Sequence, residues 1–241
     1  MNDSLAARLQ ASLNMIPAHT WYAVPSGALT FVNERSADYL GLPSDHPLRL
    51  GIETGAAWDS HIPLLHPDDH DETRRVWSKC LRTGFAGEVN FRVRDAQGGY
   101  RWFIGRADPF RASDGTLLYW IGINLDIEER KQVEFYLAEG QRLAHMGSWA
   151  FEDPGFESWS SELFRIHGLQ PGGKAPSIPE YMALVHPEDR DSVAQAIHEM
   201  LSEQRGFDFT KRIVRPDGEI RHVRCVGIPL PDCQQIGRAH V

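Results

Sequence analysis

Two histidines and a carboxylate lie close together at the start of a helix expected from residue 67 onward. His66, Asp69 and His70 could share a metal ion, because imidazole and carboxylate groups are both zinc ligands. The pattern recurs 120 residues later as His186-Pro187-Glu188-Asp189, with Arg190 in the place of the second histidine. A helix start accounts for both copies, since proline suits the first helical position and acidic residues oppose the positive end of the helix dipole. We therefore expect helix N-termini here and no metal site.

Other combinations of residues that carry chemistry are not apparent in the chain. Cys80 falls in the middle of a predicted helix, at the position of Met200 in the second copy, which indicates a core residue. The run Gly172-Gly173-Lys174 lacks the first glycine, the spacing and the hydroxyl of a phosphate-binding loop. No nucleophile–base pair and no phosphoacceptor helix is visible. The sequence thus assigns no catalytic residue and does not decide whether a longer parent protein is an enzyme.

The recurrence at an offset of 120 extends well beyond the histidines. Segments 66–107 and 186–227 align without a gap, and both carry the same turn glycine, Gly98 and Gly218. A period of this size indicates two copies of one domain rather than a solenoid of short units. The first copy has seven additional residues between Gly41 and His66, so we expect the largest local difference there.

Hydrophobic alternation, turn residues and helix caps predict the same order of elements in both copies. In the second copy these are strands 149–151 and 156–159, a helix 161–167, a capping box at Ser177 and Glu180, a helix running to about 204, and strands 207–214 and 220–227. In the first copy they are strands 21–24 and 29–32, a helix from Asn33 to Gly41, and strands 87–94, 100–107 and 117–125. This order predicts an α+β fold in which helices cover one face of an antiparallel sheet.

Several short motifs in this order resemble the PAS sensory domain. They are Gly147-Ser148-Trp149, Trp159-Ser160-x-Glu162-Leu163, His186-Pro187-Glu188-Asp189-Arg190 and Arg215-Pro216-Asp217-Gly218-x-Ile220-Arg221. In the first copy, Gly122 followed by Asp126-Ile127-x-Glu129-Arg130-Lys131 resembles the closing PAC signature. The resemblance implies, for each copy, a five-stranded antiparallel sheet of order 2-1-5-4-3 that cups a ligand or a plain core.

The resemblance leaves the ligand unknown. Flavin-binding light sensors of the family carry an Asn-Cys-Arg-Phe-Leu-Gln stretch, which this chain lacks. A haem-binding PAS domain would need an axial histidine that faces the pocket, and His66, His186 and His198 qualify only by residue type. We therefore expect neither flavin nor haem, and the sequence names no cofactor-binding residue.

A helical connection is expected between the two copies, over residues 130–144. It continues from a capping box that Asp126 and Glu129 fit. The connection is either a solvated helix or the signalling helix that PAS receptors use between domains, and the resemblance favours the second. We expect Asp126, Ile127, Glu129 and Arg130 to relay the signal.

Trp102 and Ile104 share one face of a predicted strand, where the second copy has His222 and Arg224. A large aromatic residue on an outer sheet face needs a cover. The N-terminal helix, whose apolar stripe consists of Leu5, Leu9, Leu13 and Ile16, could supply it, and so could a second copy of the chain. Both alternatives stay open, and the second would make the protein a homodimer.

The second copy is expected to be incomplete. By the offset its last strand would fall at 237–245, and nothing after Pro231 has the pattern of a strand. The last seven residues, Gln235–Val241, resemble translated read-through into a sequencing adapter, so we exclude them from the expected fold. The predicted domains are an N-terminal helix at 1–16, PAS/PAC domain 1 at 17–129, a linker helix at 130–144, an incomplete PAS domain 2 at 145–234 and the foreign segment at 235–241.

Composition argues against several classes of protein. The net charge is −8 and the isoelectric point is near 5.7, which argues against nucleic acid as a partner, because phosphate binding needs a basic surface. No apolar stretch approaches the ~20 residues of a membrane-spanning helix, and no signal peptide is apparent. Three cysteines without a CxxC pair indicate a reducing cytoplasm.

The resemblance, taken with the tandem arrangement, implies the sensory input region of a bacterial signalling protein. A histidine kinase is the output that we expect downstream, because tandem PAS units often precede one. The first alternative is a diguanylate cyclase or another output class. The second is a dimerisation module that binds no ligand.

Overall fold

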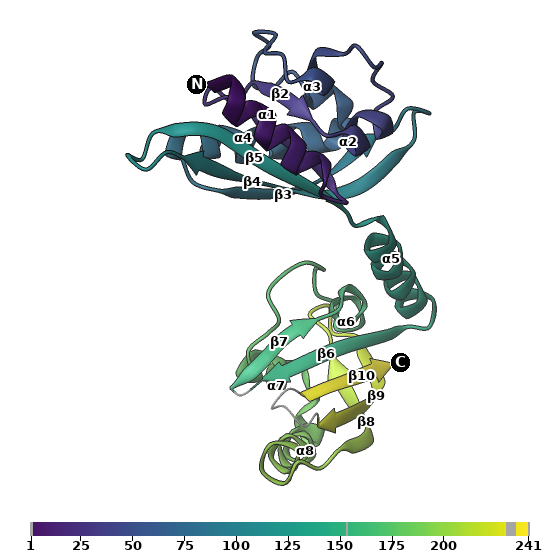
Figure 1. The fold of residues 1–241 in the computed structure, drawn as a ribbon. Helices are drawn as coiled ribbons and strands as arrows, with labels where there is room; N and C mark the ends of the chain where they lie inside the picture. The colour runs from purple at the N-terminus through teal and green to yellow at the C-terminus, as the bar shows by residue number, and fades with distance from the viewer. Residues whose placement is uncertain (1, 153, 230–234, 241) are drawn as a thin grey trace. The chain divides into compact units, whose positions relative to one another are not determined.

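The computed structural model describes residues 2–152, 154–229 and 235–240, which form two compact units, Met1–Gln132 and Val133–Val241 (Figure 1). We call them the first and the second domain. The division falls inside one helix, α5 (Glu128–Leu143), which begins in the first domain and leads along the chain into the second. The predicted linker at 130–144 therefore corresponds to most of α5.

The first domain is built on one five-stranded antiparallel sheet. Its strand order is β2-β1-β5-β4-β3, as the resemblance implied. The strands are β1 (His19–Ala23), β2 (Leu29–Val32), β3 (Gly87–Arg94), β4 (Tyr100–Arg111) and β5 (Leu117–Asp126). The helices are α1 (Asn2–Asn14), α2 (Glu34–Tyr39), α3 (Pro47–Leu50) and α4 (His70–Thr83), with short 3-10 helices at Ile62–Leu64 and Pro67–Asp69.

The second domain repeats this plan with the order β7-β6-β10-β9-β8. Its strands are β6 (Met146–Glu152), β7 (Gly155–Trp159), β8 (Phe207–Val214), β9 (Ile220–Pro229) and β10 (Gln235–His240). Its helices are α6 (Ser161–Ile166), α7 (Ile178–Leu184) and α8 (Arg190–Glu203), with a 3-10 helix at Pro187–Asp189. Ser160 caps α6, and the predicted capping box of Ser177 and Glu180 opens α7.

The two domains match at the predicted offset. Helices α4 and α8, and strands β3 and β8, have bounds that differ by 120 residues. The same ion pair ties helix to strand in each: Arg92 with Asp69 at 2.8 Å, and Arg212 with Asp189. The prediction that the domains differ most between Gly41 and His66 fits the structure, since α3 lies in this region of the first domain and α7 in the corresponding part of the second.

The prediction that the second sheet lacks its fifth strand is wrong. The segment that we had excluded from the fold forms β10, which pairs with β6 on one side and β9 on the other. The physical reason is that a ladder uses backbone N–H and C=O groups, so a segment without proline can fill the central place even when its side chains do not alternate. The strand is short, with six residues against ten in β5, and the second sheet is the smaller one.

Each domain has a hydrophobic core between the sheet and the helices α2–α4 or α6–α8. A further cluster forms on the opposite face of the first sheet, where Leu13 of α1 packs with Tyr22 and Phe31. The N-terminal helix thus covers the outer face of the sheet over β1 and β2. The inner face lies against the helices α2–α4.

Candidate functional site

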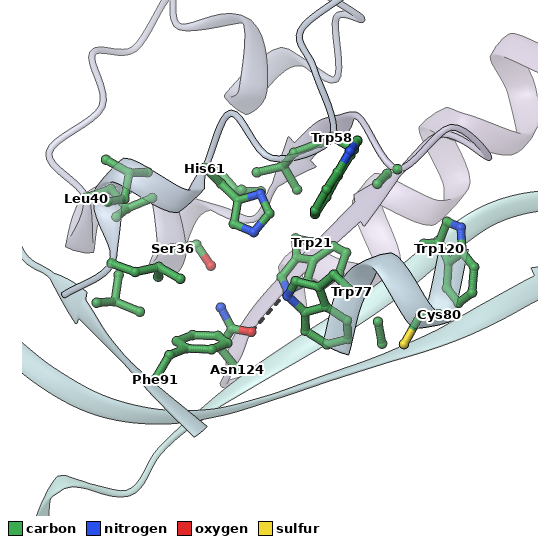
Figure 2. Close-up of a pocket in the computed structure, with 18 of the residues that line it drawn as sticks. Trp21, Ser36, Leu40, Trp58, His61, Trp77, Cys80, Phe91, Trp120 and Asn124 are labelled. Atoms are coloured by element: carbon green, nitrogen blue, oxygen red, sulfur yellow. Dashed lines mark hydrogen bonds between the residues drawn. The ribbon is translucent and has the colours of Figure 1, made fainter. Parts of the chain in front are cut away.

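A cavity of about 120 Å³ lies between the sheet and the helices of the first domain (Figure 2). Four tryptophans line it: Trp21 from β1, Trp58 from the loop after α3, Trp77 from α4 and Trp120 from β5. Aliphatic side chains and Phe91 complete most of the wall. In Figure 2 the polar side chains of Ser36, His61 and Asn124 lie together on one side of the tryptophans.

The alternation of β5 places its inward residues in this wall. Trp120, Gly122 and Asn124 point to the core, whereas Tyr119 and Ile121 belong to the cluster under α1. Trp21 is the register partner of Gly122 on the neighbouring strand, and a Cβ at residue 122 would lie 2.1 Å from the indole ring. The glycine therefore allows the indole to lie across β5.

The indole of Trp21 is held in place by a hydrogen bond. Its Nε1–H donates to Oδ1 of Asn124 at 3.1 Å, which fixes the amide so that its Nδ2 group remains a donor. The hydrogen bonds described for Asn124 include its oxygen and not Nδ2, and the buried indole N–H of Trp120 has no partner among the described residues. The Nδ2 group of Asn124 is thus a hydrogen-bond donor at the cavity wall that no described protein atom is shown to satisfy.

The cavity wall carries no formal charge. None of its lining residues is Asp, Glu, Lys or Arg. Burial lowers the pKa of His61, so its imidazole is neutral at pH 7. Burial also raises the pKa of the Cys80 thiol, which keeps it protonated. An ion inside this cavity would lack a counter-ion, which makes an uncharged occupant the favourable one.

The corresponding space in the second domain is nearly filled, with a cavity of only about 20 Å³. Larger side chains at matching positions account for the difference: Met200 replaces Cys80 on the long helix, and Phe207 replaces Gly87 on the edge strand. Lys211 of β8 also projects into this core, at the position of Phe91 in the first domain. Trp149, the counterpart of Trp21, has no acceptor for its indole N–H, because Ala239 occupies the register of Asn124.

The residues considered as metal ligands perform structural tasks. His66 accepts a hydrogen bond from the backbone N–H of Asp68, and so opens the helix as predicted. Asp69 binds the Arg92 guanidinium, which lowers the pKa of that carboxyl despite its partial burial. His70 directs Nε2 toward the carbonyl of Leu65 at 3.1 Å. Within the described residues no group of three metal-binding side chains gathers.

None of the three histidines considered for haem lines either of the two cavities described above. His66 packs against Tyr100, His186 accepts a hydrogen bond from the backbone of Glu188, and His198 is exposed on α8. The histidines that do line the cavities are His61 and His167, which the sequence analysis missed. His61 lies in the region between Gly41 and His66 that holds the additional residues of the first copy, and this was the one signal that could have pointed to it.

The residues predicted to form one packing face lie in two separate places in the structure. Leu9 and Leu13 pack in the cluster with Tyr22 and Phe31, which does not include Trp102 or Ile104. Trp102 instead lies between two cations, with the Arg92 guanidinium 4.8 Å and the Lys131 ammonium 5.6 Å from its ring centre. Lys131 belongs to α5, so the first turn of α5 covers part of the Trp102 ring.

The predicted relay residues lie at the start of α5, where Ile127 contacts Trp102. The N–H of Ile127 donates to the Trp102 carbonyl at 2.9 Å, and Asp126 binds Arg101 at 2.9 Å. A carboxylate oxygen of Glu128 accepts from the N–H of Trp102, also at 2.9 Å. The expected capping role of Glu129 is not seen, since it is exposed and Glu128 is the acidic residue that reaches β4. Arg130 lies in the first turn of α5, and its side chain is exposed.

A model of the PAS fold matches residues 29–124 and 156–238 of this chain. The chain is 29% identical over 237 residues to the uncharacterized protein y4lL of Sinorhizobium fredii, covering 92% of this chain and 27% of that protein. It is 32% identical over 176 residues to the probable diguanylate cyclase DgcE of Escherichia coli, covering 68% of this chain and 15% of that protein. The chain thus spans about a quarter or less of these relatives.

Part of this chain is similar to solved structures. A sensory box histidine kinase/response regulator from Burkholderia thailandensis matches with a TM-score of 0.42 and 24% identity, covering 56% of this chain and 96% of that one. In the part of the chain that the structure describes, no helix has the length and apolar character needed to cross a membrane. The family match covers both repeats in sequence order, and the two sheets have the strand order that the resemblance implied. The chain belongs to the PAS fold family and carries two copies of its domain.

Proposed function

We propose that this chain is the sensory input region of a signal-transduction protein and that its first domain is the sensor. The observation that carries the proposal is the contrast between the domains, a cavity of about 120 Å³ in the first and about 20 Å³ in the second. A cavity of about 150 Å³ is known to hold one benzene molecule, so the first is close to the size of a small ligand and the second is not. The second domain is then a relay or a partner-binding unit.

The relay runs through β5. Asn124 lines the cavity, and Asp126, two residues further along the same strand, binds Arg101 and caps the start of α5. Glu128 and Ile127 hold α5 against Trp102 with two hydrogen bonds. A shift of β5 on ligand binding would therefore reach the first turn of α5 without any intervening element. Asp126, Ile127 and Arg130 remain relay residues in this proposal, with Glu128 added to them.

The output domain is proposed from the relatives. Among proteins with matching segments, the sensor protein FixL of Bradyrhizobium diazoefficiens is 33% identical over 87 residues, and mak1 of Schizosaccharomyces pombe is a peroxide stress-activated histidine kinase. We propose a cytoplasmic histidine kinase as the parent protein. A diguanylate cyclase is the second candidate, because DgcE aligns over more of this chain than FixL or mak1 does.

Self-association is part of the proposal. Large apolar side chains of α5 are exposed, including Val133, Tyr136 and Leu137, and Trp102 and Ile104 lie half-buried on the outer face of β4. A second copy of the chain would cover both surfaces. Sedimentation of the chain should show a dimer that Trp102→Ala weakens measurably, with His222→Ala as the matched control in the second domain. A monomer before and after the change would contradict the dimer.

The coupling between cavity and α5 can be tested with a variant copied from the chain itself. Cys80→Met gives the first domain the residue of the second and fills part of the cavity. We expect amide exchange at Ile127 and Trp102 to change severalfold, because these amides make the bonds between β4 and α5. Met200→Cys is the control and should leave both amides as they are. Unchanged exchange in Cys80→Met would contradict the relay and favour a dimerisation module without a ligand.

A further inference from the structure

The cavity of the first domain has a polar and an aromatic part. Trp21 and Trp77 meet edge to face, with ring centres 6.4 Å apart, and Trp58 and Trp120 complete the aromatic wall. The unsatisfied Nδ2 donor of Asn124 faces the same space beside His61 and Ser36 (Figure 2). Aromatic walls favour a flat π-system, because ring pairs add to the energy of burial when they are offset or edge to face.

The donors and acceptors of the polar part define what a ligand must bring. Asn124 offers its Nδ2 donor there, since its oxygen points to the indole of Trp21 and accepts from it. The neutral imidazole of His61 retains an acceptor nitrogen, because a neutral ring carries a single N–H. The hydroxyl of Ser36 donates to Asn33 at 2.8 Å, so it too can accept. A single ligand hydroxyl that accepts a hydrogen bond from Asn124 and donates one to His61 or Ser36 would satisfy the polar part of the cavity.

The size of the cavity and the lack of charge in its wall restrict the class of ligand further. The volume of about 120 Å³ is close to that of a cavity known to hold one benzene molecule, so it suits a single six-membered ring and not a fused-ring cofactor such as flavin or haem. The uncharged wall disfavours carboxylates and ammonium groups. We propose that the first domain binds an uncharged single-ring aromatic compound with one hydroxyl group, the ring among the tryptophans and the hydroxyl oxygen on Asn124. The proposal rests on the sensor role proposed above and names the ligand class of that site.

The test is a panel of four compounds, measured by calorimetry and by tryptophan fluorescence on the whole chain. Phenol has the proposed ring and oxygen, toluene has the ring without the oxygen, cyclohexanol has the oxygen without the aromatic ring, and benzoate adds a charge. We expect phenol to bind, and toluene and cyclohexanol to bind about fivefold to tenfold more weakly, which corresponds to one hydrogen bond or one set of aromatic contacts. Benzoate should not bind measurably.

Two variants distinguish a specific effect on ligand binding from a general loss of folding. Asn124→Leu should reverse the preference and favour toluene over phenol, an outcome that mere damage to the cavity would not produce. Cys80→Met should weaken both compounds about tenfold, and Met200→Cys should change neither. Binding of benzoate ahead of phenol, or equal binding of phenol and toluene in the unaltered chain, would overturn the ligand class. Failure of all four compounds to bind would overturn it too, while a coupled response of Ile127 to Cys80→Met would still support the sensor role.

Discussion

Trp21 and Gly122 face each other across β1 and β5 so closely that residue 122 has no room for a side chain. A Cβ there would lie 2.1 Å from the indole, and the indole is fixed by its bond to Asn124. The pair sets both the wall of the cavity and the packing of the central strand. In the second domain Trp149 faces Gly237 in the same register, so both sheets use a glycine opposite this tryptophan.

Gly122→Ala should therefore destabilise the first domain. The methyl group would displace the indole or the strand, and overpacking of this kind costs about 1–3 kcal/mol. Urea unfolding, followed by amide exchange in β1 and β5, would measure the loss. Gly140→Ala is the control: a Cβ there meets nothing within 4 Å on α5, and the helix should gain about 0.5–1 kcal/mol. A neutral Gly122→Ala would contradict the described position of Trp21.

Lys211→Phe should stabilise the second domain, by about 1–4 kcal/mol. Lys211 is 3% exposed, and its Nζ donates to the Tyr181 hydroxyl, with no carboxylate beside it among the described residues. The first domain has Phe91 at this position, which indicates that the fold accepts the aromatic ring. Because the change leaves the Tyr181 hydroxyl unpaired, Tyr181→Phe in the same background should add to the gain. A loss of stability in both variants would contradict a buried amine that has no counter-ion beside it.

The same lysine predicts a pH dependence. Burial lowers the pKa of Lys211 below its usual 10.5, so the unfolded chain binds the proton more tightly than the folded one. The free energy of unfolding of the second domain should therefore rise as the pH increases toward 10.5. It should be lower at a pH where Lys211 is protonated in the folded domain, because the buried amine then carries a charge. Denaturant midpoints at pH 7 and pH 9.5 would show this slope. Lys211→Phe should remove it, and a slope that persists would assign it to another group.

Glu128→Ala should loosen the start of α5. The carboxylate accepts from the Trp102 amide, so its loss should speed exchange of that amide about tenfold, the equivalent of one hydrogen bond. Glu129→Ala is the matched control, since Glu129 is the exposed neighbour in the same helical turn. Equal effects of the two variants would mean that general helix-end charge, rather than the bond to β4, holds α5.

Asp189→Asn should change how the stability of the second domain falls at acid pH. The Arg212 guanidinium and backbone lower the pKa of Asp189 from 3.8 to about 2. A carboxyl with a depressed folded pKa stabilises the fold above pH 3.8, and this contribution is lost as the pH falls toward 2. Acid unfolding monitored by amide exchange in α8 and β8 should become less steep in the variant. Asp191→Asn, at an exposed position of α8, should leave the fall of stability at acid pH unchanged.

Much of this architecture is legible in the amino-acid sequence. The turn glycines Gly98 and Gly218, the capping residues Asn33 and Ser160, and the ungapped repeat each act through local backbone chemistry, so spacing alone predicted the order of helices and strands. The boundaries of β3 and β8 agree with the prediction to the residue. Local preference, however, does not decide which strand fills the centre of a sheet, and for this reason the formation of β10 was missed.

The cavity was decided by tertiary structure. Trp21, Trp77 and Trp120 come from three separate elements, and each alone has the pattern of an ordinary core residue. Whether such side chains fill the core or leave a cavity depends on the side-chain volumes at a few matching positions, such as Cys80 and Met200. The spacing of residues in the sequence does not report these volumes. The partners of Trp102 also depend on tertiary structure, because Glu128 and Lys131 reach it only when the first turn of α5 lies beside β4. The repeat and its fold follow from the local periodicity of the sequence, while packing between distant segments determined which copy encloses the larger cavity.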